Sequence, residues 1–310
     1  MTESSPARPQ KSPLLWRLAL SAVIIPGLIG LFVLDHRLGA RAPVLLVLAV
    51  LLAAWAAWEL CGLLSVRNIA PHAPSAIAGC VTVVAAGWYL PLSTGDATFP
   101  CGLTLAPILP AYAFSVLGLF LVAAFRFREP GGSMESLSAN VLTVSFVGLL
   151  LAMTAQLRWV AGADAGYLVL GSMIVAVKSG DIGAYTLGRL FGMRKMAPRL
   201  SPGKTWMGAL GAVLASGLAG WAWLQFATPW FNADWSPPAW YLSVLYGSVL
   251  GVAGVLGDLC ESLIKRDVGK KDSAALMPGF GGLLDLLDSV LFAGPVAWLM
   301  WTFLPLPTWA

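Results

Sequence analysis

The sequence predicts an all-α protein that crosses a membrane many times, and three features support this: its composition, the length of its apolar runs and the position of its charges. Of its 310 residues, 58% are hydrophobic and 11% are charged, whereas soluble domains have about 45–50% apolar and about 25% charged residues. The apolar residues form runs of roughly 20, the length that a helix needs to cross a hydrocarbon core of about 30 Å. The sequence lacks the alternating segments of about ten residues that are typical of membrane β-barrels.

Nine apolar runs are candidate membrane spans. They cover approximately residues 14–34, 43–64, 75–92, 103–125, 138–156, 165–190, 206–226, 239–259 and 283–305. Residues 1–13 are polar, basic and rich in proline and serine, so we expect a disordered tail. The first run is long and lacks a small-residue cleavage site, so we do not expect a removable signal. We expect residues 14–160 to form an N-terminal group of membrane helices and residues 161–310 a C-terminal group that carries the functional site.

The lysines and arginines predict the orientation of these spans. If the N-terminus is cytoplasmic, fifteen of the 19 lysines and arginines belong to cytoplasmic segments. Three (Arg37, Arg41 and Arg158) lie on the opposite side, and Lys178 lies within a span. Cytoplasmic loops of membrane proteins are enriched in these residues. The sequence therefore predicts about nine spans, with the N-terminus in the cytoplasm and the C-terminus on the opposite side.

Ionisable residues within the spans are the main functional signal, because such groups are costly inside a membrane and most often serve function. They are Glu59, Lys178, Asp181, Asp258, Glu261, Asp285 and Asp288. In the predicted orientation the acids converge on the cytoplasmic side. Two pairs of acids, one at the end of the eighth run and one at the start of the ninth, have a spacing of three, so each pair shares a helix face.

Two helix ends that each present paired carboxylates can hold a hard divalent cation such as Mg²⁺, which prefers oxygen ligands and leaves positions for phosphates. Another interpretation is that these acids are interfacial groups that pair with Lys265 and Arg266, and this applies most strongly to Glu261. Lys178 and Asp181 are also three residues apart, and an ion pair between them is as good an explanation as a direct role for the lysine.

Two further segments are suited to phosphate. Gly281 and Gly282 precede the ninth run, so their amides would lie at a helix N-terminus, where anions are favoured; alternatively, the glycines only permit a tight turn. Lys204 and Thr205 open the seventh run beside a basic loop and would make a phosphate clamp. A P-loop is excluded, because Pro198 stands where that motif needs glycine and no buried strand precedes it.

Other residue types exclude several classes of function. Four scattered cysteines without a CxxC pair indicate neither a zinc site nor a disulfide framework. The two histidines lie in connecting segments, so histidine-based catalysis is not expected. The net charge of +4 reflects the loop asymmetry, and we expect no nucleic-acid partner.

Motifs over residues 180–290 resemble those of the phosphatidate cytidylyltransferases, the CDP-diacylglycerol synthases. The matching positions are Asp181, Gly183, Ala184, Tyr185, Gly188 and Arg189, then Ser201, Pro202, Lys204 and Thr205, then Gly257, Asp258, Ser262, Lys265, Arg266, Lys271, Asp272, Pro278, Gly279, Gly281, Gly282, Asp285 and Asp288. This chain departs from the family pattern at Phe280, where the family has histidine, and at Leu286, where it has arginine.

The resemblance implies transfer of a cytidylyl group from CTP to phosphatidate, which gives CDP-diacylglycerol and pyrophosphate. On this basis Asp258, Asp285 and Asp288 are expected to hold Mg²⁺, with a second cation, monovalent or divalent, left open. The residues expected to act on or contact the two substrates are Lys265, Arg266, Lys271, Ser201, Lys204, Thr205, Asp181, Tyr185, Ser262, Asp272, Gly281 and Gly282. The expected setting is the bacterial inner membrane, with a cytoplasmic active site and a homodimer as the suggested assembly.

Three alternatives to this function stay open. Phe280 and Leu286 would fit a divergent homologue that is inactive or regulatory. Another enzyme of CTP or CDP-lipids is a second alternative, although the chain lacks the D-G-x-x-A-R run of the CDP-alcohol phosphotransferases. A transporter is disfavoured, because the outer halves of the predicted spans carry almost no charge.

Overall fold

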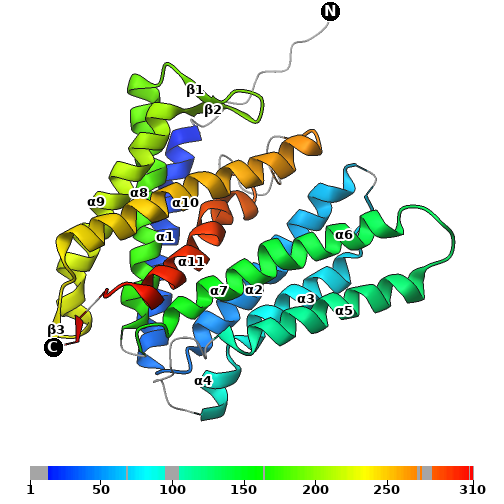
Figure 1. Cartoon of the computed structure of the whole chain (residues 1–310), viewed down its shortest axis with the longest axis horizontal. Helices are drawn as coiled ribbons and strands as arrows, with labels where there is room; N and C mark the ends of the chain where they lie inside the picture. The colour runs from blue at the N-terminus through cyan, green and yellow to red at the C-terminus, as the bar shows by residue number, and fades with distance from the viewer. Residues whose placement is uncertain are drawn as a thin grey trace, which may run out of the picture.

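A computed structural model describes residues 13–67, 69–94, 105–162, 165–270, 273, 281–306 and 308–309. It is dominated by helices, as expected (Figure 1). The N-terminal half contains α1 (Pro13–Arg37), α2 (Pro43–Ser65), α3 (Ala73–Ala86), α4 (Tyr89–Thr94), α5 (Ile108–Arg126), α6 (Ser133–Thr143), the π-helix η2 (Val144–Leu149), α7 (Leu150–Ala155) and the 3-10 helix η3 (Gln156–Arg158). The C-terminal half contains α8 (Gly166–Phe191), β1 (Lys195–Ala197), β2 (Ser201–Thr205), α9 (Trp206–Phe231), β3 (Trp235–Ser236), α10 (Trp240–Asp267), α11 (Leu284–Phe303) and β4 (Thr308–Trp309).

Seven helical segments of the described chain are long and apolar enough to cross a membrane. They are α2, α5, the continuous stretch from α6 to η3, α8, α9, α10 and α11. The protein is therefore an all-α, multi-pass membrane protein. The two remaining predicted runs fall on α1 and on α3 with α4, and α3 has only 14 residues. The count of nine spans remains a prediction, and most of the predicted disordered tail (residues 1–12) lies outside the described residues.

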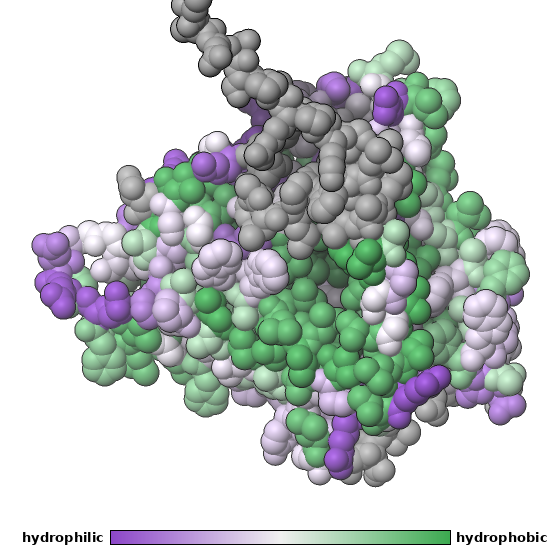
Figure 2. All heavy atoms as spheres, turned by 180° about the vertical axis from the view of Figure 1, so that it is seen from behind, coloured by the Kyte–Doolittle hydropathy of each residue, from purple (hydrophilic) through white to green (hydrophobic). Residues whose placement is uncertain are grey.

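The surface supports this membrane assignment. Large apolar side chains point outward from several spanning helices, including Leu51 on α2, Phe114 on α5 and Leu214 on α9. Figure 2 shows one face on which apolar residues cover the middle and hydrophilic residues gather toward the edges. Apolar side chains exposed at the middle of a helical bundle are suited to contact with lipid tails.

The helices α8, α9, α10 and α11 pack in sequence order, and small residues let the first three approach closely. A Cβ atom on Gly183 of α8 would collide with the carbonyl oxygen of Gly211 on α9, and the reverse collision would also occur. At the same interface Ser216 Oγ donates to the carbonyl oxygen of Ala176 at 2.8 Å. Membrane helices associate through such small residues because lipid leaves no hydrophobic driving force between them.

The N-terminal helices form a second group in which α2 packs on α3 and α3 packs on α5. Helix α11 joins the two groups, because it contacts α10 on one side and α7 on the other (Figure 1). The start of α11 therefore lies near both groups. The proposed division at residue 160 remains a prediction.

The basic loop between the sixth and seventh predicted spans forms a β-hairpin. Strands β1 and β2 pair antiparallel, with Lys195 opposite Thr205 and Ala197 opposite Ser201. Thr205 ends the hairpin and begins α9, where its side-chain oxygen accepts from the amide of Gly208 at 3.0 Å. A threonine cap of this kind satisfies one of the free amides in the first turn of a helix. The hairpin is thereby joined to the first turn of α9.

Candidate active site

Three carboxylates meet where the last turns of α10 face the first turns of α11. Oxygens of Asp258, Glu261 and Asp288 all lie within 4.8 Å of one another. Glu261 and Asp288 are buried, and Asp258 is half-buried. The two helices approach closely at this level because Gly257 has no side chain; a Cβ atom there would collide with the carbonyl oxygen of Asp288. We call Asp258, Glu261 and Asp288 the acid cluster.

The acid cluster fits the oxygen-ligand chemistry of a hard divalent cation. Glu261 is fully buried, and within the described part of the chain its Oε1 atom has no hydrogen-bond partner. A buried carboxylate oxygen without a partner is costly, so this atom calls for a ligand. The predicted metal set was Asp258, Asp285 and Asp288. The structure brings the first and third of these together with Glu261, whereas Asp285 faces a lysine.

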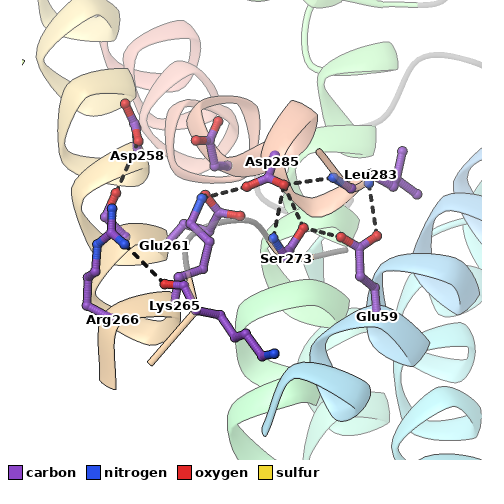
Figure 3. Close-up of polar contacts among 12 residues, drawn as sticks. Glu59, Asp258, Glu261, Lys265, Arg266, Ser273, Leu283 and Asp285 are labelled. Atoms are coloured by element: carbon purple, nitrogen blue, oxygen red, sulfur yellow. Dashed lines mark hydrogen bonds and ion pairs between the residues drawn. The ribbon is translucent and has the colours of Figure 1, made fainter. Parts of the chain in front are cut away.

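Lys265 and Asp285 form the ionic centre beside the acid cluster. The Lys265 ammonium lies 2.5 Å from Glu261 Oε2 and 2.5 Å from Asp285 Oδ1. Figure 3 shows Lys265 and Asp285 pointing toward each other between α10 and the start of α11. The spacing of four between Glu261 and Lys265 is favourable on a helix. Lys265 thus occupies one oxygen of Glu261 and leaves the other free.

The second oxygen of Asp285 is held by the segment that precedes α11. Its Oδ2 atom accepts from the amide of Gly282 at 2.7 Å, the amide of Ser273 at 3.2 Å and the hydroxyl of Ser273 at 2.8 Å. Gly281 has φ of +84°, a left-handed conformation that favours glycine. The Gly282 amide, which was predicted to meet substrate phosphate, donates to a protein carboxylate in this structure.

The β-hairpin brings a second lysine to the site. Lys204 forms an ion pair with Asp258, with 2.8 Å between Nζ and Oδ2. Arg266 joins the hairpin to the end of α10, because it donates to the carbonyl oxygens of Leu200 and Lys270, each at 3.3 Å. Ser262 Oγ lies 3.4 Å from the other oxygen of Asp258.

A cavity of about 480 Å³ opens between α8, α9, α10 and the hairpin. Its polar lining comes from Asp181, Tyr185, Arg189, Lys204, Thr205 and Asp258. The rest of the lining is mostly small or apolar, including Gly180, Ala184, Gly208 and Gly254. Five of these six polar residues were predicted to take part in the site. The cavity lining therefore combines cationic and acidic groups with small and apolar residues.

Lys178 on α8 contacts the first turns of α11. Its ammonium lies 3.0 Å from Asp181 Oδ2, 3.1 Å from the carbonyl oxygen of Leu286 and 3.2 Å from Ser289 Oγ. Lys178 thus forms an ion pair with Asp181. It also places a positive charge against the backbone of Leu286, whose own side chain is uncharged.

Sequence reasoning left some residues of this site unassigned, and others lie outside the described residues. Glu261 was set aside in favour of an interfacial role, although its spacing from Asp258 was the available signal. Ser273 gave no signal, because its contacts depend on tertiary structure. Lys271, Asp272 and Phe280 lie outside the described residues. Ser201 lies at the start of β2 and is not among the residues that line the cavity.

Sequence comparison identifies a known protein family to which this chain is similar. The chain matches the Cytidylyltransferase family over residues 16–304. It is 40% identical over 172 residues to a phosphatidate cytidylyltransferase of Mycobacterium leprae (strain TN), which covers 56% of this chain and 52% of that relative. It is 33% identical over 193 residues to a phosphatidate cytidylyltransferase of Haemophilus influenzae (strain ATCC 51907), covering 61% of this chain and 65% of the relative.

A third relative is the uncharacterized protein YnbB of Escherichia coli (strain K12), 31% identical over 218 residues that cover 67% of each chain. The chain spans about half the length of the first curated relatives it matches. The family match itself extends over nearly all the described helices. This chain belongs to the cytidylyltransferase family.

Proposed function

We propose that this protein transfers a cytidylyl group from CTP to phosphatidate and forms CDP-diacylglycerol and pyrophosphate. The observation that carries this proposal is the cavity at the ends of α8 and α10, where the Lys204–Asp258 ion pair lies beside an apolar wall between membrane helices. A site for this reaction has to accept a water-soluble triphosphate and a lipid phosphate together. The names of the relatives from Mycobacterium leprae and Haemophilus influenzae point to the same reaction.

The proposed step is a substitution at phosphorus. An oxygen of the lipid phosphate forms a bond to the α-phosphorus of CTP, and the bond from that phosphorus to the oxygen bridging to the β-phosphorus breaks. The bonding electrons leave with pyrophosphate. The nucleophile is already anionic, so no strong general base is needed. The protein has to align two polyanions and stabilise the charge that develops on the leaving group.

The cationic residues of the site suit this task. Lys204 and Arg189 line the cavity and would contact phosphate oxygens of CTP or of the lipid headgroup. Lys265 is held between Glu261 and Asp285, so its charge is fixed in position beside the acid cluster. Roles for Arg266 and for Lys271, which the family resemblance also implies, remain part of this proposal.

The acid cluster would hold Mg²⁺ through Asp258, Glu261 and Asp288. A bound Mg²⁺ supplies charge neutralisation for the phosphates of the nucleotide and of the leaving group. Asp285 is better suited to holding Lys265 than to binding the metal, because both of its oxygens already accept from Lys265, Gly282 or Ser273.

We further propose nine spans, a cytoplasmic N-terminus and an active site at the inner face of a bacterial inner membrane. CTP is a cytosolic nucleotide, so the site has to open to the cytoplasm. The bias of lysine and arginine toward one side supports the same orientation. The suggested homodimer would be tested by measuring the mass of the protein solubilised in detergent.

The test uses the purified protein with CTP labelled on the α-phosphate, phosphatidate and Mg²⁺. Labelled CDP-diacylglycerol and an equal amount of pyrophosphate are expected. Label that appears in CMP, or no labelled lipid at all, would contradict the proposal and favour another CTP-dependent enzyme or an inactive homologue. The double variant Lys204→Ala, Asp258→Asn serves as the inactive control.

A further inference from the structure

Glu59 is an acid in the C-terminal half of an apolar membrane helix of the N-terminal group. It lies in α2, whose 23 residues contain no other charged residue, and it is 3% exposed. Its side chain points away from α2 toward the segment that precedes α11, as Figure 3 shows. Burying a carboxylate costs several kcal/mol unless its oxygens are paired, so its contacts carry the argument.

The Glu59 carboxylate is bound to both sides of that segment. Oε2 accepts from the amide of Leu283 at 2.9 Å, and Oε1 forms a hydrogen bond with the hydroxyl of Ser273. Gly282 lies directly against the carboxylate, where a Cβ atom would collide with Glu59 Oε1. Glu59 therefore fixes the residue that precedes α11, the glycine before it, and Ser273.

These contacts extend without interruption into the acid cluster. The Ser273 hydroxyl also lies within hydrogen-bond distance of Asp285 Oδ2, at 2.8 Å, and donates its single hydrogen to one of the two carboxylates at a time. Asp285 Oδ1 is paired with Lys265 at 2.5 Å. Lys265 is in turn 2.5 Å from Glu261. Glu59 thus stands at one end of a chain of polar groups that crosses from α2 to α10. We call Glu59, Ser273, Asp285, Lys265 and Glu261 the polar chain.

We propose that Glu59 is a positioning residue for cytidylyl transfer: it holds Ser273 and Leu283 so that Asp285 keeps Lys265 in place beside the acid cluster. This inference rests on the proposed function. If Glu59 were lost, the Ser273 hydroxyl and the start of α11 would be held less firmly, and the Asp285 carboxylate could turn from Lys265. Lys265 would then be held by Glu261 alone, and its position beside the acid cluster would be less fixed.

Two substitutions separate positioning from a role of the charge itself. In Glu59→Gln the side-chain carbonyl can still accept from Leu283, and the amide can donate to Ser273 Oγ, which leaves the single hydroxyl hydrogen of Ser273 for Asp285. In Glu59→Leu both contacts are lost. Loss of a group that orients metal ligands without touching the metal typically lowers metal affinity or activity by about 10–100-fold. We therefore expect kcat to fall by about that factor in Glu59→Leu and by less than about threefold in Glu59→Gln.

Leu60→Ala is the matched control, because Leu60 is the next residue of α2, is fully buried and has an apolar side chain that can form no hydrogen bond. It is expected to lower the melting temperature while kcat per folded molecule stays at the wild-type value. Hydrogen exchange of the peptide that begins α11 gives a second readout, which does not depend on activity. Exchange is expected to be faster in Glu59→Leu and unchanged in Glu59→Gln and Leu60→Ala.

Three outcomes overturn the proposal. They are a wild-type kcat in Glu59→Leu, a Glu59→Gln variant as slow as Glu59→Leu, and unchanged exchange at the start of α11 in Glu59→Leu. If Glu59→Leu does not fold, Ser273→Ala interrupts the same polar chain from the other side, and a wild-type kcat there also overturns the proposal. Failure of the proposed function is a separate result, because the wild-type protein would then form no CDP-diacylglycerol while the exchange measurement still reports on Glu59.

Discussion

Glu261 is the residue of the acid cluster whose environment most clearly indicates a cation-binding role. It is fully buried, one oxygen is paired with Lys265, and within the described residues the other has no hydrogen-bond partner. Glu261→Gln keeps the shape and removes the charge. The half-saturating Mg²⁺ concentration is expected to rise by at least about 10–100-fold, because loss of a group that only orients the metal ligands already has an effect of that size.

The measurement is a Mg²⁺ titration of both activity and melting temperature, since a ligand that binds only the folded state raises its stability. Glu135→Gln, an exposed acid in the first turn of α6, is the control and should leave both curves unchanged. Wild-type Mg²⁺ dependence in Glu261→Gln would remove Glu261 from the metal site.

Asp285→Asn tests the other assignment of the same region. Asp285 engages Lys265, Ser273 and Gly282 and stands apart from the acid cluster. The variant is expected to lose about tenfold or more in kcat, because Lys265 keeps only one of its two carboxylates. The rise in melting temperature with Mg²⁺ should persist, in contrast to Glu261→Gln. Loss of that rise would instead make Asp285 a metal ligand.

The limit of sequence reasoning at this scale is geometric. A spacing of three indicates that Asp285 and Asp288 share a face of α11. That face meets α10, which carries both the lysine that pairs with Asp285 and the acids that lie near Asp288. Which acid turns to the lysine depends on how α10 crosses α11, and that crossing follows from Gly257. Ser273 and Glu59 are 214 positions apart, so no local pattern could reveal their contact.

At the level of elements, hydropathy located the helices well and their ends less well. Within the described residues, each of the nine predicted runs falls largely on helix. A long apolar run leaves the backbone no other way to satisfy its hydrogen bonds in lipid. Helix α10 continues to Asp267, eight residues beyond the predicted end near 259. Its last turns carry favourable pairs at a spacing of four, including Glu261 with Lys265. The β1–β2 hairpin has no strong strand pattern, and the sequence predicted only a basic loop there.

The contact between α8 and α9 is a testable property of these elements. Gly211 lies against the backbone of Gly183, so Gly211→Ala would force the two helices apart. Overpacking of this kind typically costs about 1–3 kcal/mol, and the cavity that both helices line should change shape. We expect a lower melting temperature and a raised KM for CTP. Gly118→Ala is the matched control, because Gly118 lies within α5 and a Cβ atom there meets nothing within 4 Å.

Gly118→Ala should leave KM unchanged and should not lower the melting temperature, since alanine favours helix over glycine by about 1 kcal/mol. If Gly211→Ala behaved like Gly118→Ala, the close approach of α8 and α9 would not be needed for the cavity.

For the whole molecule, orientation in the membrane connects the site to its substrates. The hairpin and the end of α10 carry Arg194, Lys195, Arg199, Arg266 and Lys270 at the same end of the molecule as the acid cluster. Cytoplasmic segments of membrane proteins are enriched in lysine and arginine. The connection from α9 to α10 lies at the other end of both helices and contains Asp234. A cytoplasmic site therefore requires these two regions to lie on opposite sides.

Single cysteines report this directly. Arg199→Cys and Asp234→Cys each introduce a thiol at an exposed position, and the unsubstituted protein measures the background from its own cysteines. A membrane-impermeant maleimide is expected to label Asp234→Cys in intact cells and Arg199→Cys only in inside-out vesicles. Because CTP does not cross the membrane, the opposite labelling pattern would leave the cavity facing away from the nucleotide, and the proposed reaction could not proceed in the cell.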